Sequence, residues 1–245
     1  MFLLNSLRGI TRGNRSKKHQ NNSNSGNSTS GSPFKKSSTV QLSRTNSPSS
    51  NQPPLYLLQP FVRNHLVKGN FLTIVSLPKY VDLDEWLALN VYELFTYLNH
   101  FYDVFTSFCR VDTCPIMLAG SNFDYKWLDN NRKPLSLPAP QYIEYVLAWI
   151  ENRLQDQNVF PTKAGLPFPT NFHAIVRSIY KQMFRVFAHI YYAHYGEILH
   201  LSLEAHWNSF FAHFIAFAKE FHLLDPRDTF PLKDLISVLE EQGNI

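Results

Sequence analysis

The sequence predicts a mainly α-helical domain preceded by a long basic tail, and two observations support this. Residues 1–81 hold eleven Lys or Arg and no Asp or Glu, whereas 82–245 hold all nineteen acidic residues and only twelve basic ones. From residue 82 onward, apolar side chains recur at intervals of three and four, the period of an amphipathic helix. The folded part therefore has a net charge of −7, and we expect its partner to be basic.

The tail, residues 1–54, is expected to be disordered. Most of 13–54 is Asn, Ser, Gly, Thr, Lys and Pro, which bury too little apolar surface to offset the entropy lost on ordering. Ser32 and Ser47 each precede a proline and are candidate phosphorylation sites, although ordinary linker composition explains them equally well. Residues 55–81 are predicted to be a partly ordered extension of a helical domain that covers 82–245.

Five helices joined by proline-rich segments are expected in the domain. Asp82 can cap the first helix, and Glu85 can reach back to that cap; the apolar period then continues to about Phe108. Further helices are predicted over 140–155, 171–199, 202–222 and 231–240, with proline-rich joints at 160–169 and 226–231. Between 109 and 138, Cys, Pro, Gly and Asn surround a strand-like patch at 123–127, which predicts a loop and a small β-hairpin.

Two thiols and two imidazoles form a candidate metal site. Four residues separate Cys109 from Cys114, and four separate His189 from His194; this donor set is typical of tetrahedral structural zinc. Neither pair is convincing alone, because close cysteines are often buried apolar side chains and a histidine on an aromatic face is more often a core residue. His189 and His194 would also lie about 140° apart on an ideal helix, so a bulge or a helix end must bring them together.

No motif in the sequence supports catalysis. Four protein ligands would leave a zinc ion no open position for water, and the peptidase pattern His-Glu-x-x-His is absent, Glu204-Ala205-His206 being the nearest approach to it. Neither a phosphate-binding glycine loop, a Gly-x-Ser-x-Gly elbow nor a kinase signature occurs. A zinc-dependent hydrolase and a protein that binds nucleic acid through its tail stay as alternatives. Full protein ligation of the metal would exclude the first, and salt-dependent binding lost on deleting 1–54 would support the second.

From Asp82 to about Glu240 the sequence resembles the MOB (phocein-like) family of kinase co-activators. The resemblance is carried in order by Asp82-Leu83-Asp84-Glu85-Trp86-Leu87-Ala88-Leu89-Asn90, Phe108-Cys109, Cys114-Pro115-Ile116-Met117, Tyr125-x-Trp127, Pro138-Ala139-Pro140-x-Tyr142-Ile143, Phe160-Pro161-x-Lys163-x-Gly165-x-Pro167-Phe168-Pro169-x-Asn171-Phe172, Phe184-Arg185-Val186-x-Ala188-His189-Ile190-Tyr191-x-x-His194, Glu204-Ala205-His206 and Phe214-Ile215. Such a series over some 160 residues is far more specific than any single motif.

The resemblance implies a four-helix-bundle core with extra helices and a structural Zn²⁺ held by Cys109, Cys114, His189 and His194. It also implies a protein without catalysis of its own, which binds the basic N-terminal regulatory region of an NDR/Lats-type serine/threonine kinase and activates or localises it. The expected processes are cell polarity, morphogenesis or cell-cycle control. The expected location is the cytoplasm, concentrated at the cell cortex or growth sites, with the nucleus as an alternative.

Two surfaces follow from the same resemblance. The kinase-binding positions are Asp82, Asp84, Glu85, Trp86 and Glu93, whose carboxylates could meet Arg or Lys while the indole stacks on a guanidinium; an ordinary acidic helix start with a core tryptophan is the alternative. The phosphopeptide pocket, Lys-Arg-x-x-Arg in the family, reads Lys181, Gln182 and Arg185 here. Gln182 replaces an arginine, as in the subgroup that partners NDR-type kinases, so the pocket is expected to be weakened. We expect neither a nucleic-acid partner nor a membrane span.

Overall fold

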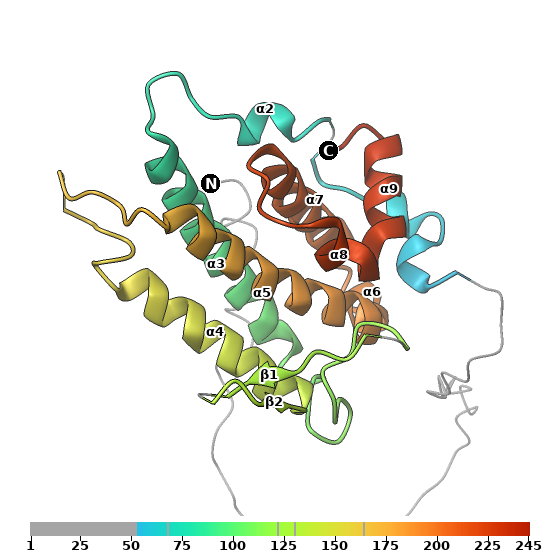
Figure 1. Ribbon diagram of the computed structural model, residues 1–245. Helices are drawn as coiled ribbons and strands as arrows, with labels where there is room; N and C mark the ends of the chain where they lie inside the picture. The colour runs from blue at the N-terminus through green and yellow to red at the C-terminus, as the bar shows by residue number, and fades with distance from the viewer. Residues whose placement is uncertain (1–52, 68, 122, 130, 164) are drawn as a thin grey trace, which may run out of the picture. The chain divides into compact units, whose positions relative to one another are not determined.

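The computed structural model describes residues 53–67, 69–121, 123–129, 131–163 and 165–245 (Figure 1). The predicted disordered tail lies outside the described residues except at 53–54, and so do the candidate phosphorylation sites Ser32 and Ser47. In the part of the chain that is described, no helix is both long enough and apolar enough to cross a membrane.

Short helical turns make up the N-terminal extension. They are η2 (Leu55–Leu57), η3 (Phe61–Arg63) and α2 (Leu72–Val75). The Asn208 side chain, on a distant helix, donates to the carbonyls of Phe61 (2.9 Å) and Asn64 (3.1 Å). The neighbouring Ser209 hydroxyl oxygen accepts the Leu66 N–H (2.8 Å). Because such short elements are not stable alone, these tertiary hydrogen bonds hold the extension in place.

The first long helix, α3 (Leu83–Phe105), begins where the sequence predicts and ends slightly early. The Asp82 carboxylate accepts the N–H groups of Asp84 (2.9 Å) and Glu85 (3.3 Å), which have no partner within the helix. At the other end, the Cys109 N–H donates to the Phe105 carbonyl (2.8 Å), where the chain leaves the helix. The end was predicted at about Phe108 because the apolar period continues into the loop that follows.

A two-stranded antiparallel hairpin, β1 (Trp127–Leu128) and β2 (Pro134–Leu135), precedes α4 (Ala139–Gln155). The predicted hairpin is thus confirmed, but its first strand lies at the end of the 123–127 patch. Asp124, inside that patch, forms a single bridge with Leu118 instead. Pro140 lies in the first turn of α4, where a missing N–H costs no helical hydrogen bond.

The predicted helix over 171–199 is two helices, α5 (Phe172–Ala193) and α6 (Tyr195–His200), so the expectation of one continuous helix was wrong. His194 stands at the break, with a non-helical φ of −127° and ψ of 13°. α7 (Glu204–Glu220) agrees closely with the helix predicted over 202–222. The last predicted helix is α9 (Lys233–Glu241), preceded in the proline-rich joint by α8 (Pro226–Thr229) and η4 (Phe230–Leu232).

The predicted four-helix bundle consists of α3, α4, α5 and α7, with α3 and α5 between the other two (Figure 1). Aromatic rings join α7 to the centre. Phe187 on α5 lies with its ring centroid 4.8–5.4 Å from those of Trp207, Phe210, Phe211 and Phe214. From α3, Phe101 stacks on Phe210 at 5.4 Å. These rings are buried, and each aromatic pair adds roughly 0.5–1.5 kcal/mol beyond the burial of its area, so they hold the bundle together.

Candidate functional site

The two cysteines lie on a tight loop directly after α3. Thr113 fixes this loop, because its hydroxyl accepts the Arg110 N–H (3.0 Å) and donates to the Phe108 carbonyl (2.6 Å). The Cys114 N–H donates in turn to the Arg110 carbonyl (2.7 Å). The turn brings both thiols to one buried place, with exposed fractions of 2% for Cys109 and 7% for Cys114.

The two histidines meet because the helix ends between them. His189 lies near the end of α5, and His194 is the residue at which α5 stops and α6 starts. On a continuous helix the two side chains would point about 140° apart. Across the break their ring centroids are 5.3 Å apart. Of the two geometries that the sequence required, a bulge or a helix end, the structure contains the helix end.

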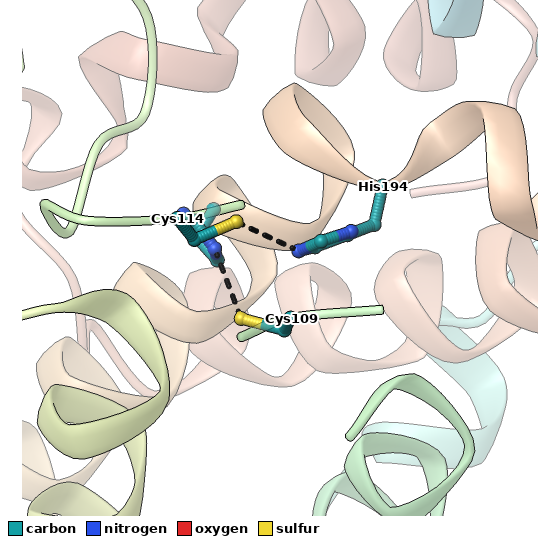
Figure 2. A group of neighbouring side chains, drawn as sticks. Cys109, Cys114 and His194 are labelled. Atoms are coloured by element: carbon teal, nitrogen blue, oxygen red, sulfur yellow. Dashed lines mark hydrogen bonds between the residues drawn. The ribbon is translucent and has the colours of Figure 1, made fainter. Parts of the chain in front are cut away.

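All four side chains form one buried cluster. Their ligand atoms lie within 4.8 Å of one another, and each histidine Nε2 is 3.5 Å from one sulfur: His189 from Cys109, and His194 from Cys114. Figure 2 shows the Cys114 sulfur directed at the His194 ring. Zinc bonds of about 2.3 Å to sulfur and 2.0–2.1 Å to nitrogen, at a tetrahedral angle, separate the two atoms by about 3.5 Å. These two sulfur–nitrogen distances fit zinc, and four protein donors would leave a tetrahedral ion no position for water.

The surroundings favour the metal-binding form of His189 and of Cys114, while the hydrogen bond to Cys114 and burial raise the pKa of the Cys109 thiol. His189 Nδ1 donates to the Leu118 carbonyl at 2.8 Å, which leaves the Nε2 lone pair facing the cluster. A hydrogen bond from Cys109, reinforced by His189 and His194, lowers the pKa of the Cys114 thiol well below its ordinary value despite burial. The thiolate that this favours is the form that binds metal. The residues present thus fit the predicted structural Zn²⁺.

The acidic residues predicted to bind a kinase lie on the first turns of α3. Asp82 and Glu85 are exposed, whereas Asp84 and Glu93 are half-buried. Partial burial and the neighbouring Asp82 raise the pKa of Asp84. The structure therefore brings Asp82, Asp84 and Glu85 together at the helix start, while Glu93 lies about two turns further along. Because one Asp82 oxygen caps the helix, Glu85 is the more available carboxylate.

Trp86 has a different environment from these carboxylates. It is half-buried, and its indole N–H donates to the Val75 carbonyl (3.0 Å), so it holds the extension against α3. The exposed apolar side chains of this face are Leu89 and Tyr92, with exposed fractions of 51% and 59%. They follow Glu85 by four and seven residues, which places all three on one side of the helix. Sequence reasoning missed this pair as a surface, although the helical spacing from Glu85 was a usable signal.

Two residues of the predicted phosphopeptide pocket, Lys181 and Arg185, line a cavity of about 140 Å³ between α5 and the 226–231 joint, whereas the third, Gln182, is not part of its lining. It is lined by Phe123, Tyr125, Lys181, Arg185, Arg227, Asp228 and Pro231. The Gln182 side-chain carbonyl accepts from the Tyr142 hydroxyl (3.2 Å) and from Arg185 (3.4 Å), so Gln182 orients the pocket's arginine. Arg227 and Asp228 were missed, because the joint reads as a proline-rich linker without a chemical signal.

Comparison with known proteins agrees with these features. The sequence model of the Mob1/phocein family matches residues 63–232. Over all 245 residues the chain is 79% identical to the whole of "Maintenance of ploidy protein mob2" of Schizosaccharomyces pombe. It is 57% identical to "CBK1 kinase activator protein MOB2" of Saccharomyces cerevisiae, over 80% of this chain and 69% of that protein. The protein of the same name in Candida albicans is 53% identical, over 87% of this chain and 68% of that protein. The chain belongs to the Mob1/phocein family.

Proposed function

We propose that this chain is a non-catalytic co-activator, which binds the basic N-terminal regulatory segment of an NDR/Lats-type serine/threonine kinase. Two relatives bear the name of a kinase activator. The observation that carries the proposal for this chain is the exposed acidic start of α3, in a domain where acidic residues outnumber basic ones by seven. A basic segment is the electrostatic complement of such a surface.

The exposed side of α3 offers two kinds of contact to that segment. The Glu85 carboxylate is available for charge-assisted hydrogen bonds to Arg or Lys. Leu89 and Tyr92 continue the same face and suit the apolar side of an amphipathic partner helix. Trp86 acts mainly by fixing the extension beside this face, since its N–H is bound to Val75.

In this proposal the Zn²⁺ is structural and the pocket at Lys181 and Arg185 is a weak phosphopeptide site. The metal supplies cross-linking between the loop after α3 and the α5–α6 junction, and its ligand set disfavours the hydrolase alternative. The nucleic-acid alternative rests on the tail, outside the described residues. We place the protein in cell polarity, morphogenesis or cell-cycle control, at the cell cortex or growth sites of the cytoplasm or in the nucleus.

Charge reversal at Glu85 tests the kinase surface. Glu85→Lys should abolish binding of the purified regulatory segment and activation of the kinase, because the lysine places a positive charge opposite the basic segment. Glu144→Lys makes the same change at an exposed position of α4 and should leave both unchanged. Circular dichroism and melting temperature establish that both variants fold. If folded Glu85→Lys binds and activates like wild type, this face of α3 is not the kinase surface.

A further inference from the structure

The cavity beside α5 is a basic pocket that already contains a carboxylate. Of its four charged lining residues, Lys181, Arg185 and Arg227 are cationic and Asp228 is anionic. Lys181 Nζ is ion-paired with Asp228 Oδ1. The pocket thus has a net positive charge suited to an anion, but one of its cations is engaged by the protein itself.

The Asp228 carboxylate is unusually enclosed. Its side chain is 15% exposed, while in four ion pairs elsewhere in the described residues (Arg110–Asp112, Lys126–Asp124, Arg177–Asp225 and Lys219–Glu240) each side chain is at least 42% exposed. A carboxylate removed from water in this way needs a cationic partner, because an unpaired buried charge is strongly unfavourable. Lys181 supplies it. Asp228 is therefore the enclosed member of the pair, whereas the Lys181 side chain, 45% exposed, lies on its solvent side.

A row of contacts positions Asp228. His173, Arg177 and Lys181 follow one another at four-residue intervals along one side of α5. His173 Nε2 lies 3.0 Å from the Phe221 carbonyl, Arg177 donates to Asp225 (2.9 Å), and Lys181 pairs with Asp228. Segment 221–228 is thereby fastened along α5 at three successive points. Asp228 is the last of them, and the fastening fixes its carboxylate in the pocket.

Arg185, the next basic residue of the row, is held differently. It donates to the Tyr142 hydroxyl (2.6 Å) and to Gln182 (3.4 Å), and its guanidinium lies 5.2 Å from the Tyr125 ring centroid. These contacts orient it without neutralising its charge. Arg185 and Arg227 are thus the cations left to an incoming anion, and the Asp228 carboxylate lies beside them with like charge to any phosphate.

We infer that Asp228 is an internal carboxylate that occupies the phosphate position of this pocket, so that a phosphothreonine peptide binds only by displacing it from Lys181. The inference deepens the pocket part of the proposed function. Asp228 thereby decides the specificity of the pocket. With the carboxylate in place the pocket discriminates against a phosphate dianion; without it, all three cations of the pocket are available to that dianion. Gln182 and Asp228 then weaken phosphopeptide binding by separate means, a missing cation and an added anion.

The test compares full-length wild type with Asp228→Asn, using a fluorescent phosphothreonine peptide with neutral flanking residues and its unphosphorylated form. Asp228→Asn should raise affinity for the phosphopeptide about tenfold or more, because a charge-assisted contact to Lys181 becomes available. Asp225→Asn breaks the exposed pair with Arg177 outside the pocket lining and should change affinity less than about twofold, as expected for a screened surface charge. Asp228→Glu keeps the charge and should bind as weakly as wild type.

Three outcomes would overturn the inference: no gain in Asp228→Asn, an equal gain in Asp225→Asn, or an equal gain for the unphosphorylated peptide. If Asp228→Asn does not fold, Asp228→Ser removes the same charge and decides by the same comparison. Binding of the kinase segment is measured on the same proteins and should not change in any of them. If wild type does not bind the kinase segment, the proposed function is rejected. The peptide comparison would still decide the role of Asp228.

Discussion

Replacing Asn208 by alanine should detach the N-terminal extension from the bundle. The Asn208 side chain is 2% exposed and makes three hydrogen bonds. It accepts from the Tyr191 hydroxyl (3.0 Å) and donates to the carbonyls of Phe61 (2.9 Å) and Asn64 (3.1 Å). At about 1 kcal/mol for each bond, the expected loss of unfolding free energy is about 3 kcal/mol.

Asn90→Ala is the matched control. Asn90 is similarly buried, at 6% exposed, but its side chain makes one hydrogen bond, to the Trp86 carbonyl within the same helix (2.8 Å). The expected loss is about 1 kcal/mol. Urea unfolding followed by circular dichroism measures both losses, and limited proteolysis measures protection of residues 55–81. The reasoning fails if Asn208→Ala loses no more stability than Asn90→Ala, or if the extension resists protease equally in both.

Three further predictions concern the metal cluster, the pocket and a buried histidine. Cys109→Ser should lower the unfolding free energy by several kcal/mol, because the energy of metal binding also stabilises the fold. This prediction is contradicted if wild type contains less than about a tenth of an equivalent of zinc and its melting temperature does not change on chelation. Gln182→Arg should bind phosphothreonine peptides several-fold more tightly, because it adds a guanidinium beside Arg185; tight binding by wild type without a gain in the variant would contradict it. Burial lowers the pKa of His213, which stacks on Phe71, to about 4, so protonation favours the unfolded chain. Stability should therefore fall as pH drops from about 6.5 toward 4, and should fall less in His213→Phe; equal slopes would show that another group is responsible.

Features determined by neighbouring residues could be predicted from the sequence. The start of α3 is an example, because its cap needs only Asp82 and two amides of the next turn. The metal cluster was predicted from residue types, spacing and family resemblance together. The form of the break at His194 was not, since the sequence required a bulge or a helix end without distinguishing them. Whether the chain forms a bulge or a helix end at His194 depends on the tertiary packing of α6 and α7.

Contacts between distant segments escaped prediction for the same reason. Asp228 is 47 residues from Lys181, and nothing near either residue indicates their pairing. Similarly, the apolar period predicted for α3 includes Leu89, which is half exposed, whereas Leu87, two residues before it, is completely buried. Periodicity shows that a helix is amphipathic, but the width of its buried side depends on the partners that pack against it.

The fastening of segment 221–228 along α5 also affects how a partner would reach the domain. Arg177 and Lys181 are cations whose fields are cancelled at short range by Asp225 and Asp228, so the stretch of α5 that carries them attracts few anions and repels few cations, in contrast to the pocket at Arg185 and Arg227. Little positive potential from these residues then opposes the attraction of a basic segment to the exposed carboxylate of Glu85 on α3. A basic segment diffusing toward the domain would be steered to α3, and its association rate would fall steeply with ionic strength while its dissociation rate changed less.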